Sequence, residues 1–503
     1  MPSPNLEADL FKAADVLRKN MDAAEYKHVV LGLIFLKYIS DSFEDQFAKL
    51  TTDISNGADP EDPDEYRAEN IFFVPSIARW QHLHANAKQP NIGTILDDAM
   101  QAIEKENQTL QGILPKVYAR QNLDPASLGQ LLDLIGNIAL GTEAAKSKDL
   151  LGRVYEYFLG EFASAEGKKG GQFYTPKSVV KLMVQMIEPY KGRIYDPCCG
   201  SSGMFIMSEQ FVRAHSGNFR DVTIYGQESN RTTYQLSRMN LAIRGIDGSQ
   251  IKWNNEGSFL NDAHPDLKAD FILANPPFNV SNWSGELLQA DQRWKYDIPS
   301  AGNANYAWLQ HMIYHLAPTG TMACVLANGS LSSNTNNEGV IRQNLLKANL
   351  VDCILALPSQ LFYNTGIAAS VWFISRARHS ETSRVLFINA RNIGYMRDHT
   401  HRDFTEADLE LITSTYHTFK KNPANFQPTP GFAAAATLQE IAESNFTLTP
   451  GRYVGAADVE DDGIPFEEQM QTLTAQLAQQ FAQGDQLQQR IRENLKGIGY
   501  DLD

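Results

Sequence analysis

The residues best suited to chemistry follow a short apolar stretch near the middle of the chain. Residues 270–274 (Asp-Phe-Ile-Leu-Ala) predict a buried parallel strand, which stops at Asn275, Pro276, Pro277 and Phe278. Proline has a fixed φ and no N–H, and it pushes the residue before it towards extended geometry. We therefore expect the Asn275 amide to be held stiffly at the carboxyl end of a strand, where open α/β sheets bind ligands.

Such a strand end suits chemistry on the exocyclic amino group of a nucleobase, whose lone pair is conjugated into the ring. The Asn275 side-chain oxygen and the Pro276 carbonyl can both accept hydrogen bonds from this group, which favours a more pyramidal, more nucleophilic nitrogen. Phe278 can stack on the base, as enzymes that act on extruded bases require. A proline turn with a core phenylalanine explains the same residues, so the neighbouring segments decide between the two interpretations.

A second segment has the pattern of a ligand-binding turn. Residues 194–204 run from an apolar strand through Asp196 into a turn of small residues, followed by a helix. The turn contains Gly200, Ser201, Ser202 and Gly203. Glycines let a ligand approach the backbone closely, and a helix N-terminus supplies N–H donors. The segment lacks both the GxGxxG spacing and the P-loop lysine, which disfavours a diphosphate ligand.

Two further segments complete the predicted site. Glu228 follows a predicted strand at 222–225, where an acidic residue grips ribose hydroxyls in sheets of this kind. Upstream, a glycine-preceded loop leads into a helix that we expect to begin near Lys177, with Thr175 as its cap and Pro176 at its first position. This loop contains Gln172, Phe173, Tyr174, Thr175 and Pro176. Helix capping alone also accounts for it.

Composition limits the choice of function. The 503 residues carry a net charge of −15, which argues against tight, unaided binding of nucleic acid through a basic surface. Phosphate charges would have to be neutralised by a local patch or by a partner. The four cysteines, Cys198, Cys199, Cys324 and Cys353, have no metal-ligand spacing and fit a reducing, cytoplasmic location. The apolar run 29–36 is too short to cross a bilayer, and no signal peptide is predicted.

We predict three domains. Residues 1–160 show helical periodicity, and residues 161–440 alternate strands with helices, which is typical of a doubly wound sheet. Residues 441–503 form a tail with a long helix over 464–495, whose narrow apolar stripe suits pairing with another helix or folding back on its own domain. Residues 431–444 are expected to be a linker. The strands are expected at 193–195, 222–225, 271–274, 321–326, 351–357, 370–374 and 384–388.

At these residues the sequence resembles the modification (M) subunits of type I restriction–modification systems, which are S-adenosyl-L-methionine-dependent adenine-N6 DNA methyltransferases. The resemblance extends over most of the chain. The order of the 172–176 loop, the 196–203 turn and the 275–278 motif is similar to the γ arrangement of amino-methyltransferases. It is carried further by the segments 152–158 (GRVYEYF), 302–312 (GNANYAWLQHM), 325–329 (VLANG) and 451–453 (GRY).

The resemblance implies a Rossmann-like class I methyltransferase sheet, preceded by an all-α domain and followed by a C-terminal helix. It assigns residues 172–177, Asp196, residues 200–203 and Glu228 to S-adenosyl-L-methionine, with Thr175 and the loop aromatics behind the methionyl part. It assigns residues 275–278 to the target adenine.

Two positions depart from the family pattern. Ser202 stands where a second glycine is common, and a serine fits there only if the backbone stays at negative φ. Ser258 replaces an acidic residue that many relatives place near the base, so that acceptor is not carried over.

The resemblance also implies partners. A specificity (S) subunit would read the sequence, two M subunits per S subunit would embrace double-stranded DNA with a flipped adenine, and a restriction (R) subunit can join. We expect the isolated chain to bind DNA weakly, and the C-terminal helix to dock on the S subunit. Two alternatives remain: methylation of cytosine N4 or of a protein glutamine, separable by product analysis, and a non-catalytic scaffold, separable by cofactor titration.

Overall fold

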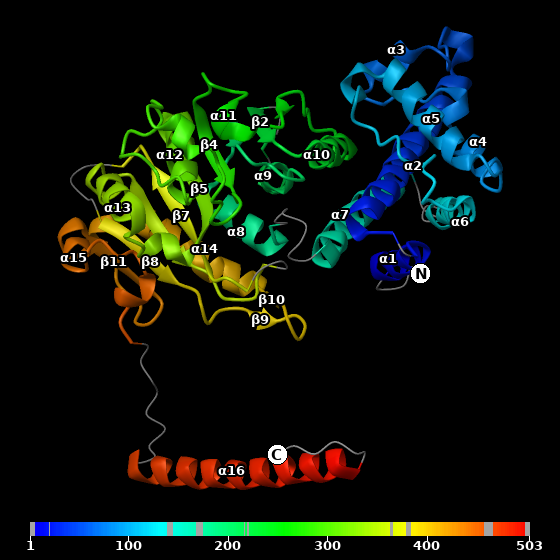
Figure 1. Cartoon of the computed structure of the whole chain (residues 1–503). Helices are drawn as coiled ribbons and strands as arrows, with labels where there is room; N and C mark the ends of the chain where they lie inside the picture. Colours follow the sequence, from blue (N-terminus) through cyan, green and yellow to red (C-terminus); the bar gives the residue numbers. More distant parts are fainter. Residues whose placement is uncertain are drawn as a thin grey trace. The chain divides into compact units, whose positions relative to one another are not determined.

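The computed structural model divides the chain into two compact units, residues 1–455 and residues 456–503 (Figure 1). Each unit is described by itself. The structure describes residues 6–19, 21–137, 144–166, 175–215, 217–218, 221–362, 366–378, 384–456 and 466–497.

The first unit begins with helices, as predicted. They are α1 (Leu6–Leu17), α2 (Ala23–Thr52), α3 (Pro63–Ala68), α4 (Trp80–Ala85), α5 (Ile92–Glu106), α6 (Pro125–Gly136) and α7 (Ala144–Glu166). α2 is the central element, because α4, α6, α7 and α10 all pack against it. The apolar run at 29–36 lies in α2 and is buried, which confirms its assignment to a core helix.

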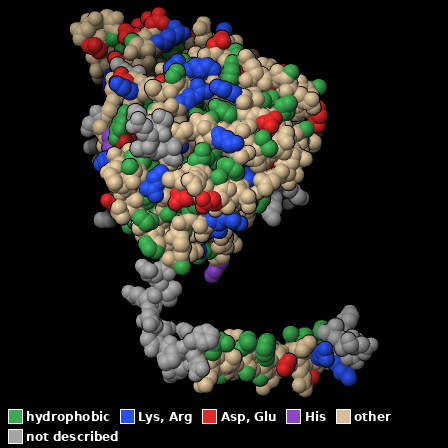
Figure 2. Space-filling view, turned by 90° about the vertical axis from the view of Figure 1, so that its left-hand side faces the viewer, with side chains coloured by type: hydrophobic (Ala, Val, Ile, Leu, Met, Phe, Trp, Pro, Cys, Tyr) green, Lys and Arg blue, Asp and Glu red, His purple; other side chains and the backbone are tan. Residues whose placement is uncertain are grey.

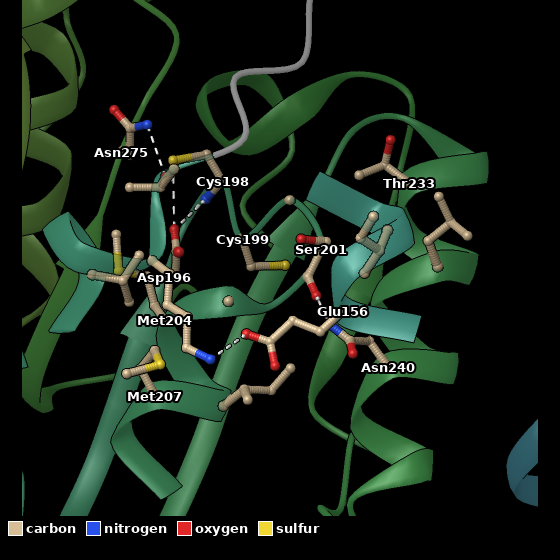
Figure 3. A pocket seen from close by; sticks show the side chains of 18 of the residues that line it. Glu156, Asp196, Cys198, Cys199, Ser201, Met204, Met207, Thr233, Asn240 and Asn275 are labelled. Carbon is tan, nitrogen blue, oxygen red and sulfur yellow. Dashed lines mark hydrogen bonds and ion pairs between the residues drawn. The ribbon is translucent and has the colours of Figure 1, made fainter. Parts of the chain in front are cut away.

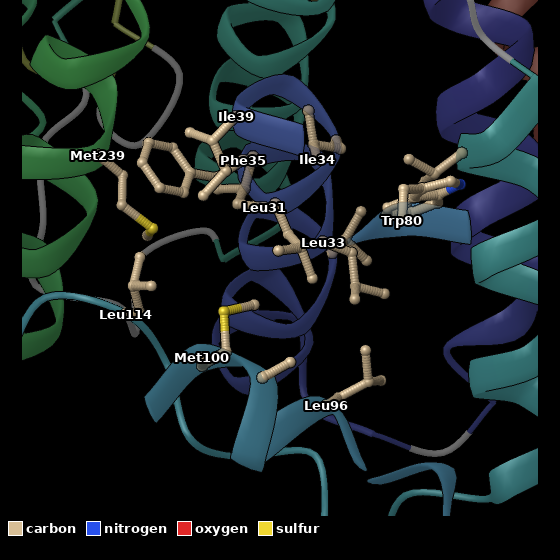
Figure 4. Close-up of a cluster of buried hydrophobic side chains, with 14 of the residues drawn as sticks. Leu31, Leu33, Ile34, Phe35, Ile39, Trp80, Leu96, Met100, Leu114 and Met239 are labelled. Atoms are coloured by element: carbon tan, nitrogen blue, oxygen red, sulfur yellow. The ribbon is translucent and has the colours of Figure 1, made fainter. Parts of the chain in front are cut away.

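The core around α2 combines aliphatic side chains with aromatic ones. Leu33 of α2 packs near Leu96 and Met100 of α5, and Met239 of α10 belongs to the same cluster (Figure 4). The rings of Phe43 and Tyr66 are stacked with centroids 4.6 Å apart. Because α10 belongs to the sheet domain, this core joins the helical region to the sheet.

A nine-stranded sheet follows, with the order β11-β8-β6-β7-β5-β4-β1-β2-β3. The strands from β5 to β3 in this order are parallel, whereas β7 runs antiparallel to β5 and β6, and β11 runs antiparallel to β8. The strands are β1 (Gly192–Asp196), β2 (Val222–Glu228), β3 (Ile251–Trp253), β4 (Ala269–Ala274), β5 (Leu316–Ala327), β6 (Val351–Ala356), β7 (Ala369–Ser375), β8 (Arg384–Asn389) and β11 (Ala433–Thr437).

Helices cover both faces of this sheet. α8 (Lys177–Ile187), α9 (Gly203–Ala214) and α14 (Glu406–Lys421) share one hydrophobic core with the strands, and α12 (Asn305–His315) and α13 (Glu338–Lys347) share the other. The remaining elements are α10 (Arg231–Ile243), α11 (Gly257–Leu260), α15 (Leu438–Glu443) and a small ribbon of β9 (Tyr395–Met396) and β10 (Arg402–Asp403). The predicted doubly wound fold is confirmed.

All seven predicted strands are present, but the predicted linker at 431–444 is wrong. It contains the edge strand β11 (residues 433–437) and α15 (438–443). Four alanines of β11 pair with β8, and three of them are buried. Alanine has low strand propensity, so only the tertiary pairing makes this segment extended.

Residues 441–455, which we assigned to the C-terminal tail, pack against the sheet. Leu448 is fully buried, and the ring of Tyr453 stacks on Phe387 of β8 with centroids 3.9 Å apart. The predicted domain boundaries themselves stay predictions.

The second unit contains α16 (Phe466–Gly497). Large apolar side chains line up along α16 and are 42–66% exposed within the chain (Figure 2). They are Met470, Leu473, Leu477, Phe481, Leu487 and Ile491. Within this unit, the helix therefore presents an uncovered apolar stripe. None of the described helices is long and apolar enough to cross a membrane.

A substitution at Arg342 tests which hydrogen bonds hold residues 441–455 in place. Its fully buried guanidinium donates to the carbonyls of Phe446 (2.7 Å) and Ser333 (2.6 Å) and to Asn334 Oδ1 (2.8 Å). Arg342→Met leaves these acceptors unpaired and is expected to lower the free energy of unfolding by about 2 kcal/mol or more, measured by urea denaturation. Arg67→Met, which removes an exposed ion pair, is the control and should change it by less than about 1 kcal/mol. Equal effects of the two substitutions would contradict this role.

Candidate active site

Three neighbouring strand ends bring the predicted residues together. Asp196 ends β1 and Glu228 ends β2, and Asn275 follows the last residue of β4. In the parallel register, Asp196 pairs with Gly226 and Tyr195 with Ile272. The three polar side chains therefore lie at one carboxyl edge, where the connections leave the sheet in different directions. Ligands bind at such switch points in open α/β sheets.

The turn after β1 forms a cradle of backbone groups. The Cys198 N–H donates to Asp196 Oδ1 (3.0 Å), and the Gly200 N–H donates to Glu228 Oε2 (3.1 Å). Gly200 has φ +53°, and a Cβ at Gly200 or at Gly203 would meet no atom within 4 Å. These two glycines therefore border open space rather than packed protein.

The condition stated for a serine at position 202, a negative φ, is not met in the structure. Ser202 has φ +68° and occupies the N-cap position of α9 in left-handed conformation. Its hydroxyl is fully buried and lies 2.5 Å from the Ser237 hydroxyl of α10. Asn240 of the same helix donates to the Ser201 carbonyl (2.8 Å). These contacts with α10 stabilise a conformation that a serine adopts only at some energetic cost.

Asp196 and Glu228 are carboxyl groups in a dry environment. Burial raises the pKa of Asp196 to about 7, partly opposed by the Cys198 N–H and increased by the charge of Glu228. Burial also raises the pKa of Glu228, although hydrogen bonds from the N–H groups of Asn230 and Gly200 lower it in part. A ligand that neutralises or hydrogen-bonds these carboxylates would relieve both pKa shifts.

The Asn275 side chain is held by one of its two polar atoms. Its Nδ2 donates to Thr175 Oγ1 at 2.9 Å, whereas Oδ1 is buried and has no hydrogen-bond partner. Leaving such an acceptor unpaired costs about 1–3 kcal/mol. Thr175 does not cap α8 as predicted, because Pro176 occupies the N-cap position and the helix begins at Lys177. The Thr175 hydroxyl orients Asn275 instead.

The rest of the 275–278 motif is partly packed. Pro276 is buried, and Pro277 and Phe278 are half-buried. The Phe278 ring meets Phe362 edge to face, with centroids 6.0 Å apart.

Asn275 lies between two adjoining cavities, which also share Cys198, Gly200 and Thr233. In the first, Asn275 lies near Asp196 and Cys198 on one side, and Thr233 lies on the other (Figure 3). The described residues that we assigned to the cofactor and that line this cavity are Thr175, Lys177, Asp196, Gly200, Ser201 and Gly203. Pro176 and Ser202 do not line it, and Glu228 lines the second cavity. Gln172, Phe173 and Tyr174 lie outside the described residues.

Several residues of the first cavity were missed at the sequence level. Glu156 of α7 pairs with Lys177 Nζ at 3.2 Å, and Thr233 and Asn240 reach the cavity from α10. Glu156 lies within the 152–158 segment of the family resemblance. Thr233 and Asn240 gave no signal, because they lie on a helix whose pattern predicts only packing.

Arg293 and His311 support the wall of the second cavity. Arg293 donates to the backbone carbonyls of Ser258 (3.1 Å) and Phe259 (2.6 Å), and its partner Asp291 lies at 2.6 Å. The Ser258 hydroxyl donates to the Pro197 carbonyl at 2.5 Å, so it helps to hold the turn after β1 in place. His311 contacts Arg293 at 3.0 Å.

Asp262, His311 and His315 are close enough together to share a metal ion. All four ring nitrogens nevertheless have protein partners, since His311 lies between Tyr195 and Arg293, and His315 lies between Leu267 and Asp262. A hydrogen-bond network accounts for these residues.

A basic groove lies where α2 and α10 meet the 112–120 segment. Its basic side chains are Lys27, His28, Lys116, Arg120 and Arg231. Burial lowers the pKa of His28 to about 4, so its charge is absent at neutral pH. Glu25 is an acidic residue in the lining. The groove is thus a local positive patch on an acidic chain.

Known proteins share this architecture. The N-6 DNA Methylase model matches residues 146–462, and the HsdM N-terminal domain model matches residues 6–135. The methylase subunit of the HindI type I restriction enzyme from Haemophilus influenzae is 48% identical over 85% of this chain and all of its own length. The MjaIX methylase subunit from Methanocaldococcus jannaschii is 38% identical, covering 99% and 92% of the two chains.

Solved structures agree. The type I restriction–modification methyltransferase subunit from Streptococcus thermophilus has a TM-score of 0.77 and 26% identity, over 90% of this chain and all of its own. This chain therefore belongs to the N-6 adenine DNA methylase family, among the methylase subunits of type I restriction enzymes.

Proposed function

We propose that this chain transfers the methyl group of S-adenosyl-L-methionine to N6 of an adenine that is flipped out of double-stranded DNA. The observation that carries the proposal is the unpaired Oδ1 of Asn275, a buried acceptor between two adjoining cavities. One cavity would take the cofactor and the other the base. Positioning two reactants side by side contributes much of the rate enhancement in such transfers.

The first cavity fits an adenosyl cofactor. The open backbone at Gly200 and Gly203 allows close approach, and the Asp196 carboxylate can accept hydrogen bonds from ribose hydroxyls or from an amino group. The Glu228 carboxylate, which lines the adjoining second cavity, could accept a further one. When bound, S-adenosyl-L-methionine supplies a methyl group on a sulfonium that becomes a neutral thioether. The turn after β1 lacks the lysine of a P-loop, in agreement with this choice.

Asn275 would act on the target amino group. With Nδ2 fixed by Thr175, Oδ1 can accept one hydrogen bond from the adenine amino group, and the Pro276 carbonyl can accept the other. These contacts would localise the nitrogen lone pair. After the N–C bond has formed, the amino nitrogen must lose one proton, and no strong base is required because the methylated amino group is then acidic.

We infer that the active species is a complex. A specificity subunit would select the DNA sequence, two copies of this chain would surround the duplex, and a restriction subunit can join. The net charge of −15 makes a partner or the basic groove necessary for phosphate contacts. A cytoplasmic location stays a prediction.

Asn275→Ala tests the transfer itself. Co-expression with a specificity subunit, followed by mapping of methylated bases, should show N6-methyladenine with the wild-type chain. The variant should lose at least about a thousandfold in rate, since both positioning and polarisation of the amino group are removed. Cofactor affinity by calorimetry should change little. If the variant retained methylation, Asn275 would have no part in the transfer. If the wild-type chain methylated cytosine instead of adenine, the assigned product would be wrong.

Asp196→Asn should show a pH-dependent stability difference. The pKa of Asp196 is higher in the folded state (about 7) than its ordinary value, so the wild-type fold loses stability as pH rises from about 4 to 7. The cofactor-free variant lacks this loss and should gain in melting temperature relative to wild type over that range, with a constant difference above pH 7. Its cofactor affinity should fall. A difference in melting temperature that did not depend on pH would contradict the raised pKa of a buried Asp196 carboxyl. Asp247→Asn, at an exposed turn, is the control.

The apolar stripe of α16 should dock on the specificity subunit. Leu477→Glu combined with Phe481→Glu places charges on that stripe and should abolish assembly in size-exclusion chromatography, while the isolated chain keeps its melting temperature. Gln479→Glu on the polar face is the matched control and should assemble normally. Normal assembly of the stripe variant would show that the helix serves another purpose.

A further inference from the structure

The second cavity contains an unexplained polar atom besides Asn275 Oδ1. Trp308 of α12 lines this cavity and is 7% exposed, and its indole N–H has no hydrogen-bond partner. Four other tryptophans donate their indole N–H to an acceptor. Trp253 donates to Ser229, Trp283 to Ser300, Trp294 to Leu288 and Trp372 to Ser330. Buried tryptophans normally find an acceptor, so the exception at the cavity calls for a cause.

The ring of Trp308 is held by its surroundings. Its centroid lies 4.2 Å from that of Phe259, whose backbone carbonyl accepts a hydrogen bond from the buried Arg293 guanidinium at 2.6 Å. Trp308 also meets His311 edge to face at 6.3 Å, and His311 in turn contacts Arg293. A side chain fixed in this way presents its N–H in one direction at little entropic cost on binding.

We infer that Trp308 is a specificity residue that donates its indole N–H to a ring nitrogen of the target adenine, either N1 or N7. This inference rests on the proposed function. The adenine amino group lies between N1 and N7, and both are hydrogen-bond acceptors. Asn275 and Trp308 both line this cavity, and their unpaired atoms, the acceptor Oδ1 and the donor Nε1, match the amino group and its neighbouring ring nitrogen.

The same pair discriminates against guanine. Guanine presents a carbonyl oxygen where adenine has its amino group, and an N–H at ring position 1. The carbonyl oxygen would face the Asn275 acceptor, and the N–H would face the Trp308 donor if N1 is the partner. Unpaired or opposed polar groups in a buried site reject the wrong ligand strongly.

Trp308→Phe tests the assignment, since it removes the N–H and keeps an aromatic ring. The assembled complex is assayed by single-turnover methylation of duplexes that carry the mapped site with adenine, 1-deazaadenine or 7-deazaadenine at the target. On adenine, the variant should be about tenfold slower than wild type. On the analogue that lacks the accepting nitrogen, the ratio of wild type to variant should fall to about one, and it should stay near ten on the other analogue. This comparison identifies N1 or N7.

Trp294→Phe is the matched control, because its N–H bonds to Leu288 and Trp294 does not line the cavity. It should give the same ratio on all three duplexes. A constant ratio for Trp308→Phe, or wild-type rates on adenine, would overturn the inference while the proposed function stands. Absence of methylation by the wild-type complex would instead overturn the proposed function. If Trp308→Phe fails to fold, wild-type rates are compared with a 3-deazaadenine duplex, and equal rates on all three analogues overturn the inference.

Discussion

The hydrogen bond from Asn275 Nδ2 to Thr175 Oγ1 is the constraint on which the site depends. An amide has a donor end and an acceptor end, and fixing the donor end determines where the acceptor points. The following two prolines restrict the backbone, and the register of β1, β2 and β4 places Asp196 and Glu228 at the same edge. The described part of the site therefore follows from one side-chain contact and one strand arrangement.

Buried arginines hold short segments around this framework. Arg293 donates to the backbone carbonyls of Ser258 and Phe259 in the single-turn helix α11, and Arg342 donates to the carbonyls of Ser333 and Phe446. In both cases a buried guanidinium satisfies backbone carbonyl groups of a short segment. A planar guanidinium with five donors is suited to this purpose, since a loop near a ligand cannot leave its carbonyls unpaired.

Much of the fold and part of the site could be predicted from the sequence. The seven central strands are apolar runs, six of which end at or directly before a polar residue, and this pattern is local. β11 could not be predicted, because alanines become a strand only when β8 is beside them. The positive φ of Ser202 depends on Ser237, which lies on another helix. Trp308 lies on a helix, where an aromatic residue predicts packing, and only the structure reveals its unpaired N–H.

The two carboxyl groups at the strand ends couple ligand charge to protons. Burial raises the pKa values of both Asp196 and Glu228, and the charge of Glu228 raises that of Asp196 further. A ligand with a net positive charge would favour the ionised form of Asp196, whose pKa is about 7, so its entry would release protons to solvent, and loss of that charge would draw protons back. A product with one positive charge fewer would then be held less tightly than the ligand from which it came. The same burial that destabilises the empty fold would in this way help the site to empty after each turnover.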